Sequence, residues 1–253
     1  MAKIYLSPAL HGNDNPTKCP VKCSENTHCG QYVDRLEKRL KELGFSVKRG
    51  GPATGTEAMY ARVRESNAWG ADLHYVAHTN AGGGRYSMTM CWNDAINKKA
   101  ANVMNQYRKA LPPGSWHKVV PNNDLYEIRA TRAVCLYDEL IFHDNAEDCR
   151  WFHDGGMEKM AEDAVKAFCD WFDVPYRSEN AGKPAINKPA AFALSREPLY
   201  VSSTAKSAVG TATGNYYRWD NKVINGRVRI TVKPEWIGKA GQVTGWISEK
   251  AVK

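Results

Sequence analysis

The pattern of apolar and polar positions alternates between two periods over the first 172 residues. Short apolar runs bounded by polar residues or glycine are typical of buried strands, and they fall at residues 3–7 (KIYLS), 45–48, 71–77 (ADLHYVA), 85–91 and 133–137. Segments with apolar residues three or four positions apart are typical of amphipathic helices, and they fall at residues 32–43, 57–69, 93–110 and 146–172. This alternation predicts an α/β fold with a twisted, mostly parallel sheet flanked by helices.

The pattern changes toward the C-terminus. Residues 176–197 combine prolines with small and polar residues, a composition that is typical of linkers. The residues that follow show short alternating runs separated by glycines, which predicts a small all-β barrel. We therefore expect a first domain at residues 1–175, a linker at residues 176–197 and a second domain at residues 198–253.

The clearest hairpin signal lies at residues 222–230 (KVINGRVRI). Asn225 and Gly226 stand between two alternating runs, and a type I′ turn needs positive φ at both of its central residues. The alternation predicts that Val228, Ile230 and Val232 point into the barrel, whereas the residues between them point outward.

Length and composition set the first limits on function. A chain of 253 residues of which 43% are hydrophobic can bury a large domain, or a medium domain and a small one. The first residues (MAKIYLSPAL) lack the apolar run of a signal peptide, and no segment approaches the roughly 18 apolar residues of a membrane span. We expect a protein made in the cytoplasm without a signal peptide, and no membrane insertion.

The formal net charge of +8 is unevenly distributed. Residues 183–253 hold 12 Lys and Arg against 4 Asp and Glu, which leaves 23 of each sign in residues 1–182. Such an asymmetry predicts a polyanionic partner for the C-terminal segment. Nucleic acid and anionic cell-wall polymers are both polyanions, and charge alone does not distinguish them.

The seven cysteines all lie in the first 169 residues, at positions 19, 23, 29, 91, 135, 149 and 169. An odd number argues against a complete disulfide framework and favours free thiols. Cys19, Cys23 and Cys29 have the spacing C-x3-C-x5-C of a metal knuckle, but no second close pair of Cys or His completes a tetrahedral set. The favoured interpretation of these three is loop cysteines or a local disulfide.

Polar residues follow three of the predicted strands: His11, His78 and Glu139. Ligands bind beyond the carboxyl ends of the strands in an open parallel sheet, so these side chains are candidates for one site. Each also has an ordinary structural interpretation, and Glu25, which follows Ser24, fits the acidic first turn of a helix. Two His and one Glu form the ligand set of a catalytic zinc. These residues are far apart in the sequence, however, so their spacing alone does not establish that they bind one ion.

The segments HGNDNP, SENTHCGQYVDRLEKRLKELGFSV, YARVRESNAWGADLHYVAHTNA and AVCLYDELIFHDNAED follow one another between residues 3 and 172. Together they resemble the zinc-dependent N-acetylmuramoyl-L-alanine amidases of the third amidase family. The resemblance implies one catalytic Zn²⁺ bound by His11, Glu25 and His78, with Glu139 as the catalytic acid/base. Asp138 is the rival for that role, but strand alternation sends it to the opposite face of the sheet.

Other residues of the resemblance have expected structural roles or depart from the pattern. Arg62 and Asn67 match a helix pattern to which we give a structural role, and Phe142 and Asn145 complete the motif E-x-x-F-x-x-N. Thr79 stands where serine or another small residue is usual. The insertion TKCPVKC lies between two expected ligands and is expected to reshape one wall of the groove.

The C-terminal segment resembles bacterial Src-homology-3-like domains in its strand GRVRITV and its ending GWI. This resemblance implies binding to peptidoglycan or to attached anionic wall polymers such as teichoic acid. Our candidate wall-binding residues are Tyr217, Trp219, Arg227 and Arg229. Aromatic and basic residues also occur together in proteins that bind single-stranded nucleic acid, but that function does not fit an amidase, so we expect no nucleic-acid partner.

The combined interpretation is a peptidoglycan hydrolase that cleaves the amide bond between N-acetylmuramic acid and the L-alanine of the stem peptide. The missing export signal favours a phage endolysin, made in the host cytoplasm and then released to a Gram-positive wall, over a secreted bacterial autolysin. Two alternatives stay open. One is a zinc peptidase that cuts within the stem peptide, and the other is a wall-binding protein without enzyme activity.

Overall fold

The computed structural model describes residues 1–19, 22–178, 191–238 and 241–252. The chain divides into two compact units, Met1–Glu179 and Asn180–Lys253. Part of the linker expected at residues 176–197 therefore lies outside the described residues. Another part of it does not have linker structure, because the first strand of the second unit already begins at Phe192.

The first unit is built on a six-stranded sheet in the order β2-β1-β3-β6-β4-β5. Its strands are β1 (Lys3–Pro8), β2 (Ser46–Arg49), β3 (Leu73–Asn80), β4 (Tyr86–Cys91), β5 (Trp116–Pro121) and β6 (Val134–Phe142). Neighbouring strands are parallel except β4 and β6, which are antiparallel. The predicted α/β fold with a mostly parallel sheet is confirmed, whereas β5, which is short and half-buried, was missed.

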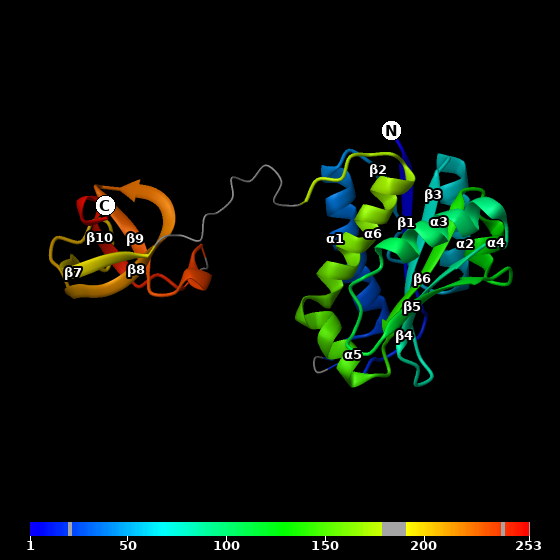
Figure 1. Ribbon diagram of the computed structural model, residues 1–253, viewed down its shortest axis with the longest axis horizontal. Coiled ribbons are helices and arrows are strands. Elements are labelled where there is room, and N and C mark those ends of the chain that lie inside the picture. The colour runs from blue at the N-terminus through cyan, green and yellow to red at the C-terminus, as the bar shows by residue number, and fades with distance from the viewer. Residues whose placement is uncertain (20–21, 179–190, 239–240, 253) are drawn as a thin grey trace. The chain divides into compact units, whose positions relative to one another are not determined.

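Helices cover both faces of this sheet. They are α1 (Glu25–Glu42), α2 (Thr56–Trp69), α3 (Ala95–Tyr107), α4 (Tyr126–Ala130), α5 (Ala146–Trp151), the π-helical turn η1 (Phe152–Gly156) and α6 (Met157–Trp171). Helix α6 packs against both α1 and α3 over one face of the sheet, and α1 and α6 lie side by side in Figure 1. Helices α2 and α4 contact each other on the other face. Among the described residues, no helix combines the length and the apolar character needed to cross a membrane.

The continuous helix predicted at residues 146–172 is wrong. Asp154 and Gly155 leave helical geometry inside η1, and Gly155 has a φ of 85°. Glycine adopts positive φ without a steric penalty, so the chain can change direction here before α6 begins. The segment directly before this break carries His153.

The larger core of the first unit lies between the sheet and α1, α3 and α6. It contains Leu36, Tyr75, Met104, Leu140 and Phe168, each at most 2% exposed. Burying such side chains stabilises the fold by about 1.5–3 kcal/mol each. The core therefore holds β1, β3 and β6 in fixed register, and these are the strands that position the site described below.

The second unit contains an antiparallel sheet in the order β10-β9-β8-β7. Its strands are β7 (Phe192–Leu199), β8 (Gly210–Ile224), β9 (Arg227–Thr231) and β10 (Gly245–Ser248), and the short 3-10 helices η2 (Pro234–Trp236) and η3 (Glu249–Ala251) follow β9 and β10. The expected small all-β barrel is not confirmed, because strand pairing among the described residues forms an open sheet with β7 and β10 at its edges. Within the described residues, the bridge Tyr200–Trp246 ties the residue after β7 to β10.

The predicted hairpin joins β8 to β9. Asn225 and Gly226 have φ values of 53° and 70°, as a type I′ turn requires. Val228 and Ile230 are fully buried as expected, but Thr231 is also fully buried and Val232 is 42% exposed. The predicted alternation fails there because β9 ends at Thr231, after which the chain turns away from the sheet.

Candidate catalytic metal site

His11, Glu25 and His78 come together at the carboxyl ends of β1 and β3. The Nε2 atom of His11 lies 3.3 Å from Nδ1 of His78 and 3.1 Å from Oε2 of Glu25. The other carboxylate oxygen, Oε1 of Glu25, lies 3.1 Å from Nδ1 of His78. One ligand atom from each side chain therefore lies within 4.8 Å of the others, an arrangement that fits a divalent metal ion.

The local sequence explains how Glu25 reaches this position. Ser24 is the N-cap of α1 and accepts a hydrogen bond from the amide of Thr27, so the helix begins at Glu25. Asn15 Nδ2 donates to Oε2 of Glu25 at 2.9 Å, and the amide of Thr79 donates to Oε1 at 3.0 Å. The carboxylate is thereby held from two sides.

His11 is held by a neighbouring asparagine. The amide of His11 donates to Oδ1 of Asn26 at 2.9 Å, and Nδ2 of Asn26 donates back to the carbonyl of His11 at 3.0 Å. This reciprocal pair fixes the loop after β1 against the first turn of α1. The candidate ligand Glu25 and Asn26, the residue that holds the candidate ligand His11, are thus adjacent in α1.

The electrostatics of the group favour a charged carboxylate. Burial opposes ionisation of Glu25, but the hydrogen bond and charge of His78, with the donors Asn15 and Thr79, lower the pKa of Glu25 to about 2. Burial lowers the pKa of His78, yet the adjacent Glu25 carboxylate raises it overall. A cation at the centre would take the place of the imidazole proton as the partner of this carboxylate.

Glu139 lies beside this group on the neighbouring strand. It is the register partner of His78 in the parallel pair β3–β6, so both side chains leave the sheet on the same side. Its Oε2 atom is buried and has no hydrogen-bond partner among the described residues. Burial raises the pKa of Glu139 to about 7 although the charge of His78 lowers it, and such a carboxyl group can exchange a proton near neutral pH.

Asp138 faces the opposite side of the sheet. It is fully buried, forms an ion pair with the fully buried Arg108, and accepts a hydrogen bond from the hydroxyl of Tyr75 at 2.6 Å. Thr89 also donates to it. The rival interpretation, in which Asp138 faces the crevice, is therefore wrong, because its carboxylate is used within the core.

Other residues of the sequence motifs have structural roles. Arg62 donates to the carbonyls of Pro8 and Gly51, and Asn67 bridges to the carbonyl of Ala130 and the amide of Arg132. In a separate set, Phe142 packs its ring on Gly84, where an added Cβ would lie 2.3 Å from the ring, and Asn145 caps α5. These contacts hold the strand ends and loops around the site.

A pocket of about 270 Å³ opens beside His11 and His78. Met59, Tyr126 and Tyr137 line it, and the Tyr137 ring stacks on the His78 ring with centroids 4.8 Å apart. Glu127, which the sequence patterns did not reveal, also lines the pocket; its Oε1 accepts from Ser7 Oγ at 2.6 Å and contacts His74 Nε2 at 3.2 Å. A substrate group in this pocket would lie directly against the candidate metal ligands.

The favoured interpretation of Cys19, Cys23 and Cys29 as loop cysteines or a local disulfide is wrong for Cys29, which lies in α1, and all three are free thiols. Cys29 is fully buried in the core, whereas its neighbour His28 lies with Cys19, Cys23 and His153 in a second group of possible metal ligands. Adjacent helix residues point about 100° apart, so only one of the two can face the loop that carries Cys19 and Cys23. The sequence signal for His28 was its place one turn into α1, but nothing in the sequence pointed to His153.

The candidate wall-binding residues lie on β8 and β9. Arg229 lies over the Trp219 ring at 4.3 Å and pairs with Asp220, whereas Arg227 donates to the carbonyls of Ser202, Ser203 and Ala205. Tyr217 is half-buried and pairs in register with Thr231. Both arginines are thus engaged in contacts inside the second unit.

The fold of the first unit is similar to that of known amidase catalytic domains. The catalytic domain of CwlV, an N-acetylmuramoyl-L-alanine amidase from Bacillus (Paenibacillus) polymyxa var. colistinus, matches with a TM-score of 0.62 and 18% identity over 69% of this chain and 100% of that chain. An N-acetylmuramoyl-L-alanine amidase from Clostridium difficile 630 matches with a TM-score of 0.57 and 18% identity over 69% of this chain and 98% of that chain.

The catalytic domain of an endolysin targeting Clostridia difficile matches with a TM-score of 0.54 and 17% identity over 67% of this chain and 98% of that chain. Neither a protein-family model nor a curated protein sequence matches this chain. At these identities the comparisons establish the fold, and the chemistry has to be argued from the site.

Proposed function

We propose that this chain is a zinc-dependent N-acetylmuramoyl-L-alanine amidase, a peptidoglycan hydrolase that cleaves between N-acetylmuramic acid and L-alanine. The observation that carries the proposal is the convergence of His11, Glu25 and His78 beside Glu139, whose buried Oε2 has no hydrogen-bond partner in the described part of the chain. The fold likeness to amidase catalytic domains and the sequence motifs support it.

The residues present fit a catalytic zinc. Two neutral imidazoles and one carboxylate are a common ligand set for this ion and leave a coordination position open. Zn²⁺ held there would supply a Lewis acid for the amide carbonyl and would lower the pKa of water. The low pKa of Glu25 keeps its carboxylate ionised and ready to bind a cation at neutral pH.

Glu139 has the role of general base and then general acid. Its carboxylate accepts a proton from the water that attacks the carbonyl carbon, and it delivers this proton to the leaving nitrogen of L-alanine. The C–N bond breaks as the C–O bond forms, which leaves a free carboxylic acid on the lactyl group and a free amine on the peptide. A divalent cation beside Glu139 favours its ionised form at the start of the cycle.

The second unit is proposed to bind the cell wall. The excess charge of +8 in residues 183–253 suits anionic polymers such as teichoic acid, and Tyr217 and Trp219 are candidates for contact with peptidoglycan. A hollow of about 370 Å³ lined by Tyr200, Arg229 and Trp246 offers one place for a wall ligand. In this proposal Arg227 and Arg229 both shape the surface and contribute positive charge.

We infer that the biological role is that of a phage endolysin acting on Gram-positive walls from the cytoplasmic side of the host after release. The likeness to an endolysin catalytic domain supports this role, as does a separate basic unit for wall retention. The zinc peptidase and the wall-binding protein without activity remain the competing functions.

Mass spectrometry of digested peptidoglycan tests the reaction directly. The amidase gives new L-alanine amino termini and glycan strands with free lactyl carboxyl groups. New termini elsewhere in the stem peptide would replace the proposal with the peptidase, and binding to walls without any new terminus would replace it with the inactive binder.

A further inference from the structure

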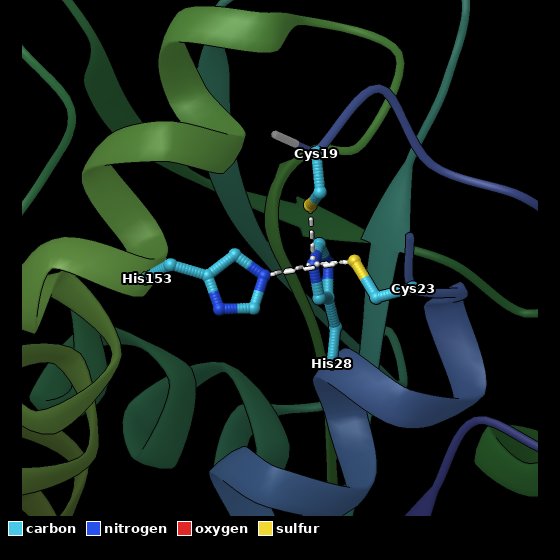
Figure 2. Close-up of side chains that lie close together, drawn as sticks. All are labelled: Cys19, Cys23, His28 and His153. Atoms are coloured by element: carbon cyan, nitrogen blue, oxygen red, sulfur yellow. Dashed lines mark hydrogen bonds between the residues drawn. The ribbon is translucent and has the colours of Figure 1, made fainter. Parts of the chain in front are cut away.

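Four metal-ligand side chains meet at a second place in the first unit, outside the catalytic group. Cys19 and Cys23 come from the loop before α1, His28 from the second turn of α1, and His153 from η1 (Figure 2). Figure 2 shows the two sulfur atoms and the His153 ring approaching the Nε2 end of the His28 ring from different directions. Residues 125 positions apart in sequence thus face one another.

The distances between the ligand atoms are close to those of a tetrahedral zinc centre, and most of them are somewhat shorter. Nε2 of His28 lies 2.8 Å from Sγ of Cys19, 3.2 Å from Sγ of Cys23 and 3.0 Å from Nε2 of His153. Sγ of Cys23 lies 3.6 Å from Nε2 of His153. With bonds of about 2.3 Å to sulfur and about 2.0 Å to nitrogen, ligand atoms around Zn²⁺ lie about 3.3–3.8 Å apart, so small outward movements would admit the ion.

Hydrogen bonding does not account for this crowding. A ring nitrogen carries at most one proton, so Nε2 of His28 can form one good hydrogen bond and not three. Imidazole and thiolate groups are both ligands of zinc, so a bound zinc ion would account for these contacts.

We propose that Cys19, Cys23, His28 and His153 bind a second Zn²⁺, at a structural site with all four positions filled by protein. On binding, each thiol loses its proton to solvent as its sulfur–zinc bond forms, so two protons are released and the two thiolates balance the charge of the ion. Thiolate and imidazole ligands select zinc over magnesium or calcium. The single catalytic zinc expected from the sequence is then one of two ions.

The site would attach a loop of the first unit that has little regular structure to two helical segments. Between Gly12 and Ser24, the described residues form turns and the isolated bridge Pro16–Ser24, but neither a helix nor a strand. An ion bound by Cys19 and Cys23 attaches this loop to α1 and to η1. Asn15, which donates to Glu25, belongs to the same loop, so the site also supports the carboxylate of the catalytic group.

The proposal is tested by counting metal ions and identifying their ligands. Wild-type protein prepared with zinc should contain two ions per chain by elemental analysis. The double variant His11→Ala/His78→Ala should keep one ion, and its cobalt form should show thiolate-to-cobalt charge-transfer absorption with the d–d bands of a tetrahedral site. Cys19→Ser/Cys23→Ser should lose that absorption and one ion, whereas the control Cys169→Ala should keep two ions.

The catalytic-site variant keeps the proposal falsifiable even if the cysteine variant fails to fold. A His11→Ala/His78→Ala protein that binds no metal, or binds cobalt without thiolate absorption, overturns the structural site. Thiol titration that shows a disulfide between Cys19 and Cys23 in the purified protein also overturns it. None of these measurements depends on wall hydrolysis, so they stand whether or not the proposed amidase activity is found.

Discussion

Glu139 and His78 are register partners on adjacent parallel strands, and their side chains share one side of the sheet. The register shifts by one residue after this pair, because Asn80 pairs with Phe142, so β6 has one residue more than β3 here, as in a β-bulge. Bulges are common next to active sites, where they redirect side chains. The relationship places a buried carboxyl group with a pKa of about 7 beside a candidate metal ligand, and both residues belong to strands rather than to loops.

Replacing Glu139 by Gln should lower the rate of wall hydrolysis by about two to four orders of magnitude, because the amide cannot accept the proton of water. Zinc content and thermal stability should remain close to those of the wild type. Turbidity loss of purified cell walls measures the rate. The matched control is Glu147→Gln, an exposed carboxylate with 69% of its side chain accessible, and it should retain full activity. Activity of Glu139→Gln within threefold of wild type contradicts the assigned role.

Replacing His78 by Ala should remove the catalytic zinc and abolish detectable hydrolysis, because two ligands cannot hold the ion with useful affinity. Elemental analysis after dialysis, paired with the wall-lysis assay, checks both effects. His117→Ala is the control, since His117 contacts Ser87 and Thr89 and belongs to neither metal group. Loss of zinc from the control as well would mean that the effect is general unfolding.

Replacing Asp138 by Asn should destabilise the fold and leave the chemistry intact. The substitution leaves the guanidinium of Arg108 buried without its charge partner, which typically costs about 3–5 kcal/mol in the free energy of unfolding. Urea denaturation monitored by fluorescence gives this free energy. The double variant Arg108→Met/Asp138→Leu should recover much of the loss, and a single variant as stable as wild type would show that the pair contributes nothing.

The raised pKa of Glu139 predicts a pH-dependent stability of the metal-free protein. An unfolded glutamate ionises around pH 4.5, but the folded one keeps its proton until about pH 7. The folded state therefore binds more protons in this window, and the free energy of unfolding falls as pH rises from about 4.5 to about 7, by up to about 3 kcal/mol. Denaturation of chelator-treated wild type and Glu139→Gln across this pH range measures the contribution of Glu139 to the free energy of unfolding. If this free energy changes with pH in the same way in both proteins, Glu139 does not cause the change.

Binding of the inactive Glu139→Gln protein to cell walls should weaken as salt concentration rises. Residues 183–253 carry the whole excess charge of +8, and salt screens attraction to an anionic polymer. Co-sedimentation with walls at increasing sodium chloride measures the bound fraction. Walls stripped of teichoic acid serve as the comparison and should bind less protein at low salt. Binding that does not respond to salt would assign retention to aromatic contacts alone.

The sequence predicted those parts of the fold and site that have local signals. Alternating periods predicted the order of most strands and helices, but the helix predicted at residues 32–43 begins earlier, at Glu25, with Ser24 as its cap. Strand alternation correctly predicted that Asp138 and Glu139 point to opposite faces of the sheet, because neighbouring side chains in a strand alternate between the two faces.

The other features of the fold and of the second ligand group were not predictable from the sequence, because they depend on contacts between residues far apart in the chain. His28 and His153 come together only when η1 lies against α1, and no local pattern encodes that contact. The break at Gly155 was hidden inside an otherwise helical pattern of apolar residues. In the second unit, Thr231 is buried by its surroundings rather than by its place in the alternation.

Glu25 and His28 lie three residues apart in the first turns of α1, so one short helical segment supplies a ligand to each metal group. Fraying of that segment would pull a ligand from both centres in the same event. Under the two proposals above, heat or chelation would then remove both ions and the proposed activity in one step, without a long-lived species that keeps only the ion bound by His11, Glu25 and His78. Unwinding of residues 24–28 would therefore disrupt both groups of candidate metal ligands at once.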